Sequence, residues 1–134
     1  MANEAILVQR LQDRLPTCEV KGDVDITKGT VLKITLTETN RGAASAADGD
    51  LFLGIAAADY STNDVPDTLT IWTKGIFLMK CDGVGVAAGD LVKIGGANLI
   101  SVADDATAAG LSEVIGLCLE DGGAGDEVMV RLGL

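Results

Sequence analysis

The chain contains no histidine, so it lacks the side chain that most often serves as the base for a Ser or Cys nucleophile. Zinc sites use histidine or closely spaced cysteines, whereas Cys18, Cys81 and Cys118 lie far apart in the sequence. The composition therefore predicts no catalytic triad, no metal centre and no cofactor site. An odd number of distant cysteines also indicates reduced, partly buried thiols rather than a disulfide framework.

Aromatic and basic residues are scarce as well. One Trp, one Tyr and two Phe are too few to build a surface on which sugar rings could stack. Ten Lys and Arg residues stand against twenty Asp and Glu residues, for a net charge of −10. Because nucleic-acid binding requires clustered positive charge, we expect no nucleic-acid partner. The acidity would keep a concentrated protein soluble or complement a basic surface.

Long apolar runs are missing from the sequence. No stretch approaches the length that spans a bilayer, and the N-terminus lacks the charged start, apolar run and small-residue cleavage site of a signal peptide. We therefore expect no membrane association and synthesis in the cytoplasm. With 134 residues, 17 Gly and two Pro, the chain is typical of one ordered, turn-rich domain.

An internal repeat is the most informative feature that is present. Three segments recur in the same order, with matching residue classes, about sixty positions later: 26–34 as 86–94, 53–59 as 115–121 and, more weakly, 69–75 as 127–133. Such self-similarity is typical of a duplicated structural unit. We expect two similar β-rich units of about sixty residues, covering about 26–75 and 86–133 of one domain (21–134). The repeated motifs carry no reactive side chains, so their role is structural.

Alternating side chains favour β-structure within each unit. Leu32, Ile34 and Leu36 are expected on one face of a strand that begins at Thr30. Further strands are expected at 51–58, 69–72, 76–80, 90–94, 98–102, 113–119 and 127–132, where 69–80 forms either a hairpin or one long strand with a glycine bulge. Residues 40–50 and 60–67 are predicted to be loops, and 103–110 a helical turn or a loop. The fold class is therefore all-β, a compact barrel or sandwich.

The first twenty residues stand outside the repeat. They form either a short helix with the apolar stripe Leu7, Val8, Leu11 and Leu15, ended by a proline, or an extended arm. An isolated helix of this length is marginal without packing. Either conformation exposes an apolar edge, so we expect this segment to bind a partner.

Carboxylates gather in the predicted loops. The pairs Asp48/Asp50, Asp104/Asp105 and Asp126/Glu127 are the candidates for acid–base catalysis. The segments 48–50 and 121–127 offer the hard oxygen ligands that calcium prefers. Neither matches a known calcium-binding loop pattern, and Asp among glycines more often bonds the backbone of its own turn. We therefore predict turn-forming carboxylates and no catalytic pair, with calcium binding as the alternative.

Two further residues allow alternative interpretations. Lys80 follows Met79 midway between the two repeats, as the modified lysine of a biotin or lipoate carrier domain would. The predicted turn comes two residues later, however, which favours a plain strand lysine. Trp72, the one tryptophan, is either a contact residue, because Trp is enriched at interaction hot spots, or a core residue.

Taken in order, these motifs resemble the small decoration (cement) proteins of tailed-bacteriophage heads. The matching segments are 1–7 (MANEAIL), 27–33 (TKGTVLK), 52–57 (FLGIAA), 72–77 (WTKGIF), 114–117 (VIGL) and 128–132 (VMVRL). They extend over nearly the whole chain. The order of the motifs carries the resemblance more than any single one does.

The resemblance implies a non-enzymatic, β-tulip-like protein, commonly a homotrimer, that binds the outer surface of an assembled capsid at local threefold positions and stabilises it. Its partners would be the major capsid protein and copies of itself, and its location the virion. In this family an N-terminal arm reaches the shell or the adjoining subunits, a role that falls here on residues 3–15. We predict as contact residues Ile6, Leu7, Val8, Leu11, Leu15 and, as a lesser candidate, Trp72. The alternatives are a biotinyl or lipoyl carrier domain and a small glycan- or host-surface-binding module.

Overall fold

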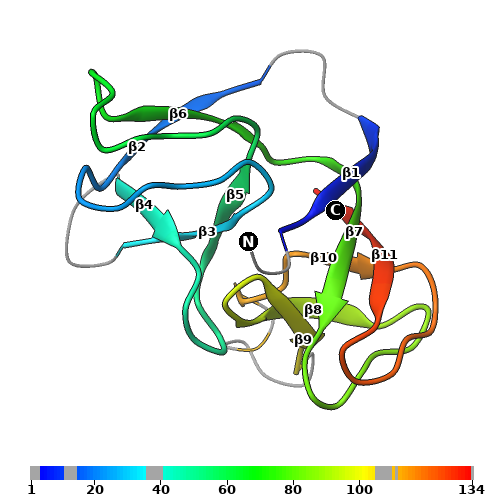
Figure 1. The fold of residues 1–134 in the computed structure, drawn as a ribbon. Coiled ribbons are helices and arrows are strands. Elements are labelled where there is room, and N and C mark those ends of the chain that lie inside the picture. Colours follow the sequence, from blue (N-terminus) through cyan, green and yellow to red (C-terminus); the bar gives the residue numbers. More distant parts are fainter. Residues whose placement is uncertain (1–3, 11–14, 36–40, 105–109, 111, 134) are drawn as a thin grey trace.

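The computed structural model describes residues 4–10, 15–35, 41–104, 110 and 112–133. Within them, two closed five-stranded β-barrels lie side by side, and a further strand, β1 (Ile6–Arg10), is attached to the second barrel (Figure 1). The first barrel contains β2 (Thr17–Val20), β3 (Val31–Ile34), β4 (Arg41–Ala44), β5 (Phe52–Ala56) and β6 (Thr68–Trp72). The second contains β7 (Gly75–Cys81), β8 (Leu91–Gly96), β9 (Leu99–Val102), β10 (Gly116–Cys118) and β11 (Glu127–Leu132). The predicted all-β fold of two similar units is confirmed, and each unit closes into a barrel of its own.

The two barrels have the same strand order and the same pairings. In each, the first strand pairs in parallel with the third and antiparallel with the fifth. The second strand pairs with the third and the fourth, and the fourth with the fifth, all antiparallel. Turn contacts repeat too: the Lys28 N–H donates to the Asp59 carboxylate at 2.7 Å, and the Ala88 N–H to Asp121 at 2.8 Å. The sequence repeat is therefore a structural duplication.

The third sequence match is displaced by one residue in the structure. Ile71 lies opposite Ala56 in the first barrel, and Val130 lies opposite Cys118 in the second. Ala56 and Cys118 occupy the same position of the repeat, so Ile71 corresponds to Val130. The sequence comparison set Ile71 beside Met129, which is wrong by one position because both segments are short and apolar.

Apolar side chains that face inward form a core in each barrel. The core of the first barrel consists of Val20, Ile26, Leu32, Ala56, Tyr60, Leu69 and Ile71. The core of the second is larger and continues across the junction, where Val31, Ile55 and Trp72 of the first barrel pack against it. Burial of this shared apolar surface holds the two barrels together.

Polar contacts also join the barrels. The connection from β8 to β9 docks on the first barrel, where the Asn98 side-chain oxygen accepts the Val31 N–H at 2.8 Å. The Asn98 N–H in turn donates to the Ser45 hydroxyl at 3.1 Å. Lys93 of β8 forms an ion pair with Asp48 of the first barrel at 3.0 Å. These specific contacts thus fix the position of one barrel relative to the other, in addition to the apolar burial.

Several predicted strands are confirmed, and three local predictions are wrong. Residues 41–44 form β4 where a loop was expected, because pairing with β2 on one side and β3 on the other outweighs the weak strand propensity of Arg-Gly-Ala-Ala. Residues 17–20 form β2, so the first unit begins earlier than predicted. The strands β6 and β7 form neither a hairpin nor one strand, because each belongs to a different barrel.

The β8–β9 hairpin and the strands at β5, β10 and β11 lie where they were expected. Most of the predicted helical turn or loop at 103–110 lies outside the described residues. In the part of the chain that the structure describes, no helix has the length and apolar character needed to cross a membrane.

Candidate functional site

The predicted contact residues of the N-terminal segment fall on and beside β1. The segment 6–10 is an extended strand, so the helix alternative is wrong there. Ile6 and Val8 point outward and are 53% and 48% exposed, whereas Leu7 and Leu15 are partly buried and pack against the core of the second barrel. Leu11 lies outside the described residues. Of the predicted residues that the structure describes, Ile6 and Val8 are therefore the two with exposed side chains.

The strand β1 lies at the edge of the second barrel. It pairs antiparallel with β7, with Ile6 opposite Leu78, and it has no other partner among the described strands. Just before it, the Ala5 N–H donates to the Gly29 carbonyl of the first barrel at 2.6 Å. The segment thus contacts both barrels of its own chain. An edge strand with an open side is a common site of further pairing or docking.

An apolar row crosses three strands on the outer face of the second barrel and ends at a residue just past a fourth. Ile6 of β1 lies opposite Leu78 of β7, and Leu78 lies opposite Met129 of β11. The Leu119 N–H, just past β10, donates to the Met129 carbonyl at 2.9 Å, which places Leu119 next in the row. Facing side chains on paired strands share one face of the sheet. We call these four residues the apolar stripe.

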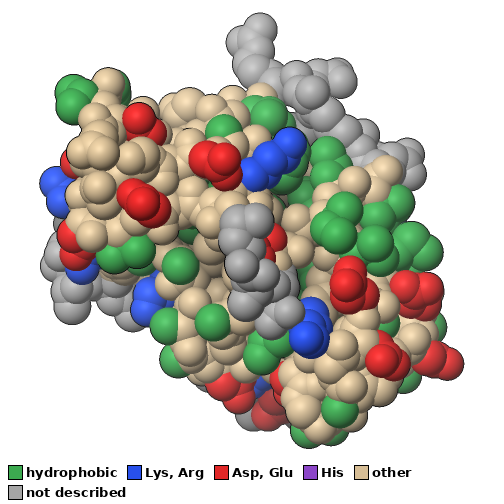
Figure 2. Space-filling model, in the orientation of Figure 1, with side chains coloured by type: hydrophobic (Ala, Val, Ile, Leu, Met, Phe, Trp, Pro, Cys, Tyr) green, Lys and Arg blue, Asp and Glu red, His purple; other side chains and the backbone are tan. Residues whose placement is uncertain are grey.

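The apolar stripe is open to solvent along its length. Ile6 and Leu119 are exposed, and Leu78 and Met129 are partly exposed. Figure 2 shows hydrophobic side chains grouped over the part of the molecule where β1, β7 and β11 lie in Figure 1. Contiguous apolar surface of this kind is typical of a protein–protein contact.

Trp72 lies in the core instead of at the surface. Its side chain is 7% exposed, its ring centroid lies 5.6 Å from that of Phe77, and the Lys28 ammonium lies 5.6 Å from its centroid. A buried indole cannot reach a partner without rearrangement of the junction. The structure therefore supports the core alternative for Trp72.

Lys80 does not lie on an exposed hairpin tip. It belongs to β7, where it faces Glu127 of β11 on one side and Leu99 of β9 on the other. A carrier lysine must protrude from a turn to reach its ligase, so this position favours the plain strand lysine.

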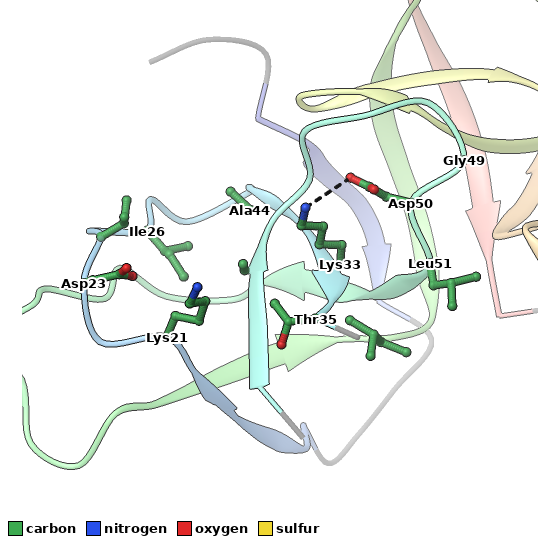
Figure 3. Close-up of a pocket in the computed structure, with 12 residues that line it drawn as sticks. Lys21, Asp23, Ile26, Lys33, Thr35, Ala44, Gly49, Asp50 and Leu51 are labelled. Carbon is green, nitrogen blue, oxygen red and sulfur yellow. Dashed lines mark ion pairs between the residues drawn. The ribbon is translucent and has the colours of Figure 1, made fainter. Parts of the chain in front are cut away.

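A groove of about 580 Å³ opens on the first barrel (Figure 3). It is lined by apolar side chains that include Ile34 and by charged ones, among which Lys33 and Asp50 form an ion pair at 3.8 Å. Burial opposes ionisation of Asp50, but the backbone N–H groups of Ala46 and Ala47 and the Lys33 charge outweigh it and lower its pKa. Asp50 therefore remains charged and holds the loop and Lys33 together.

Several other loop carboxylates bond to backbone N–H groups. Asp126 accepts the Gly123 N–H at 2.9 Å, and the corresponding Asp64 accepts the Ser61 N–H at 2.8 Å. Asp25 likewise accepts a backbone N–H. Within the described residues, no three His, Cys, Asp or Glu side chains gather closely enough to hold a metal ion. For Asp126 the predicted turn-forming role is confirmed, whereas Asp48 forms an ion pair with Lys93 of the second barrel.

The same two-barrel fold is found in a solved structure from a phage head. The N base of head fiber gp8.5 of bacteriophage phi29 matches with a TM-score of 0.57, over 90% of this chain and 93% of that chain. The two sequences are 16% identical. This chain has the fold of a phage head-fiber base. No protein-family model matches the chain, and no curated protein matches it in sequence.

Sequence reasoning found one end of the apolar stripe and missed the rest. Leu78 and Met129 lie on strands whose alternate residues fill the core. An apolar residue at an outward position of such a strand was the available sequence signal for an exposed apolar surface. That signal alone does not show that the outward residues of different strands form one row.

Proposed function

We propose that this chain is a structural protein of a tailed-phage head that binds the outer surface of the assembled capsid through the apolar stripe. The stripe is the observation that carries the proposal, because it places four apolar side chains on one rigid β-face. The fold shared with a phage head-fiber base supports a location on the head. The motif resemblance to decoration proteins supports binding as a homotrimer at local threefold positions.

Rigid β-structure suits this role energetically. A protein that binds the assembled lattice more tightly than its separate subunits stabilises the lattice by mass action. A preformed face loses little conformational freedom on binding. When several copies of the stripe engage together, a modest affinity at each one becomes strong retention.

The experiment is co-sedimentation with heads of the cognate phage that lack this protein. We expect the double variant Ile6→Glu/Leu119→Glu to bind such heads about tenfold or more weakly than the wild type, because two charges would be buried in the contact. The matched control is Val65→Glu/Val84→Glu, which introduces the same charges at two exposed valines outside the stripe.

Both variants should retain the circular dichroism spectrum of the wild type, since all four positions are exposed. Full occupancy of heads by the Ile6/Leu119 variant would show that the stripe is not the capsid contact. Loss of binding by the control variant alone would move the contact to another face.

A further inference from the structure

The junction between the barrels joins two unlike surfaces. The first barrel contributes what we call the receiving face: Val31, Ser45 and Asp48. The second barrel contributes what we call the inserting face: Lys93, Ile94 and Asn98. The contact is therefore heterologous, which means that two different surfaces meet in it.

Because the barrels are duplicates, the first barrel also has a region equivalent to the inserting face, and the second barrel has a region equivalent to the receiving face. We call these two regions the inserting counterpart and the receiving counterpart. Lys33 and Ile34 of the first barrel correspond to Lys93 and Ile94 of the inserting face. Leu91 of the second barrel corresponds to Val31 of the receiving face. Backbone hydrogen bonds support this correspondence. The Ala103 N–H, just after β9, donates to the Leu91 carbonyl at 2.8 Å, and the Ser45 N–H, just after β4, donates to the Val31 carbonyl at 2.8 Å.

Both counterparts are open in the single chain. Val31 is 1% exposed at the junction, whereas Leu91 is partly exposed. The Ile94 side chain is fully buried, whereas the Ile34 side chain is 39% exposed. The Ile94 carbonyl also accepts the Gly49 N–H of the first barrel at 2.9 Å. The groove in Figure 3 lies at this open counterpart. The segment 46–50 covers the equivalent place on the second barrel.

The ion pairs of Lys33 and Lys93 also differ between the open counterpart and the inserting face in the junction. Each of the two lysines pairs with a carboxylate of its own barrel, Lys33 with Asp50 at 3.8 Å and Lys93 with Glu113 at 3.9 Å. Lys93 has in addition Asp48 from the other barrel. Among the ion pairs of the described residues, Lys33 has no such cross-barrel partner.

The sequence supplies the matching groups for a second copy. The segment that follows β9 carries Asp104 and Asp105, as the segment that follows β4 carries Asp48. Both halves of a second junction are thus present on each chain, one on each barrel.

We propose that copies of this chain associate head to tail by repeating their internal junction. The open inserting counterpart of one copy, centred on Lys33 and Ile34, docks on the open receiving counterpart of the next copy, centred on Leu91. A heterologous contact of this kind closes into a ring when its rotation permits. The proposal concerns contacts between copies and does not depend on capsid binding by the apolar stripe.

Sedimentation velocity of the full chain with two single-face variants tests this arrangement. We expect the wild type to associate as concentration rises, and Lys33→Glu and Leu91→Glu each to remain monomeric when studied alone. A mixture of the two variants should form a one-to-one dimer, because one intact inserting counterpart and one intact receiving counterpart remain. Both variants add negative charge, so a new attraction between them cannot explain recovery.

Val65→Glu serves as the matched control, since it adds a negative charge at a side chain that is 94% exposed and that lies outside the groove lining and off β3 and β8. It should associate as the wild type does, and so should the Ile6→Glu/Leu119→Glu variant that tests capsid binding. If Lys33→Glu fails to fold by circular dichroism, Ile34→Glu replaces it as the variant blocked on the inserting side, because the Ile34 side chain is 39% exposed.

Three results would overturn the proposal. The first is a wild type that stays monomeric at millimolar concentration, and the second is undiminished association of either single-face variant. The third is a mixture that remains monomeric, because a contact of two identical surfaces would be lost in both variants and could not be restored by mixing them.

Discussion

Trp72 and Phe77 lie on either side of the short link between the barrels, with ring centroids 5.6 Å apart and ring planes tilted by 55°. The link consists of Thr73 and Lys74, between the end of β6 and the start of β7. Tilted aromatic pairs at this separation attract beyond their burial alone. The pair therefore helps to extend the core of the second barrel across the junction into the first barrel.

Removal of the Trp72 side chain should destabilise the whole protein. We expect Trp72→Ala to lower the free energy of unfolding by about 3–5 kcal/mol, the usual cost of deleting a buried aromatic ring. Urea unfolding followed by circular dichroism measures it. Val84→Ala, at a side chain that is 85% exposed, should change stability by less than about 0.5 kcal/mol. A loss below about 1 kcal/mol at Trp72 would mean that the barrels do not depend on the shared core.

Gly29 and Gly89 offer a matched test of the N-terminal segment. Both have positive φ, 92° and 90°, at equivalent turns of the repeat. A Cβ at Gly89 would meet open space, whereas a Cβ at Gly29 would lie 2.6 Å from the Ala5 carbonyl. We expect Gly89→Ala to cost about 1–2 kcal/mol of backbone strain, and Gly29→Ala to cost more and to displace β1 from β7.

Denaturation and hydrogen exchange measure these two effects. The amides of β1 should exchange faster in Gly29→Ala than in Gly89→Ala. Equal stability and equal exchange in the two variants would show that the contact between Ala5 and Gly29 contributes nothing.

Tyr60 should make stability fall at alkaline pH. Its hydroxyl donates to Asp67 at 2.5 Å, and this hydrogen bond, with burial and nearby carboxylates, raises the pKa of Tyr60 from 10.0 to about 12. Because the folded state favours the protonated phenol, the stabilisation is complete below pH 10 and is lost as the pH rises towards about 12. The difference in urea midpoint between wild type and Tyr60→Phe should therefore shrink over this range. A difference that stays constant with pH would contradict the assignment.

The three thiols should differ in reactivity. Burial raises the pKa of all three above the ordinary 9.0, but Cys18 is partly exposed whereas Cys81 and Cys118 are buried. Since the thiolate is the reactive form, we expect Ellman's reagent to modify Cys18 slowly in the native protein and the other two after unfolding. Cys18→Ser should abolish the native phase. A native phase that persists in this variant would mean that the second barrel opens readily.

The duplication and its turns were predictable because they depend on local chemistry. A glycine at the same place in both copies indicates a turn with positive φ, and Gly29 and Gly89 both have one. The apolar pattern around Leu32 and Val92 likewise indicates strands with one buried face, and both side chains are fully buried.

Other elements depend on neighbours that lie far away in the sequence. Apolar residues at positions 7, 8, 11 and 15 suit a helix as well as an arm, and pairing with β7 decides for a strand at 6–10. Arg41–Ala44 is a strand because β2 and β3 flank it. The apolar stripe combines residues from β1, β7 and β11 with one just past β10, so it exists through strand register, which no single segment encodes.

The position of β1 has a mechanical consequence. This strand precedes the first barrel in the chain but pairs with β7, which follows that barrel. The first barrel is therefore inserted between two adjacent strands of the six-stranded sheet that contains β1 and the strands of the second barrel. The strands nearest the two ends of the chain, β1 and β11, both flank β7. Tension applied to the two ends would therefore be borne by the hydrogen bonds among these three strands. The first barrel would not bear this force.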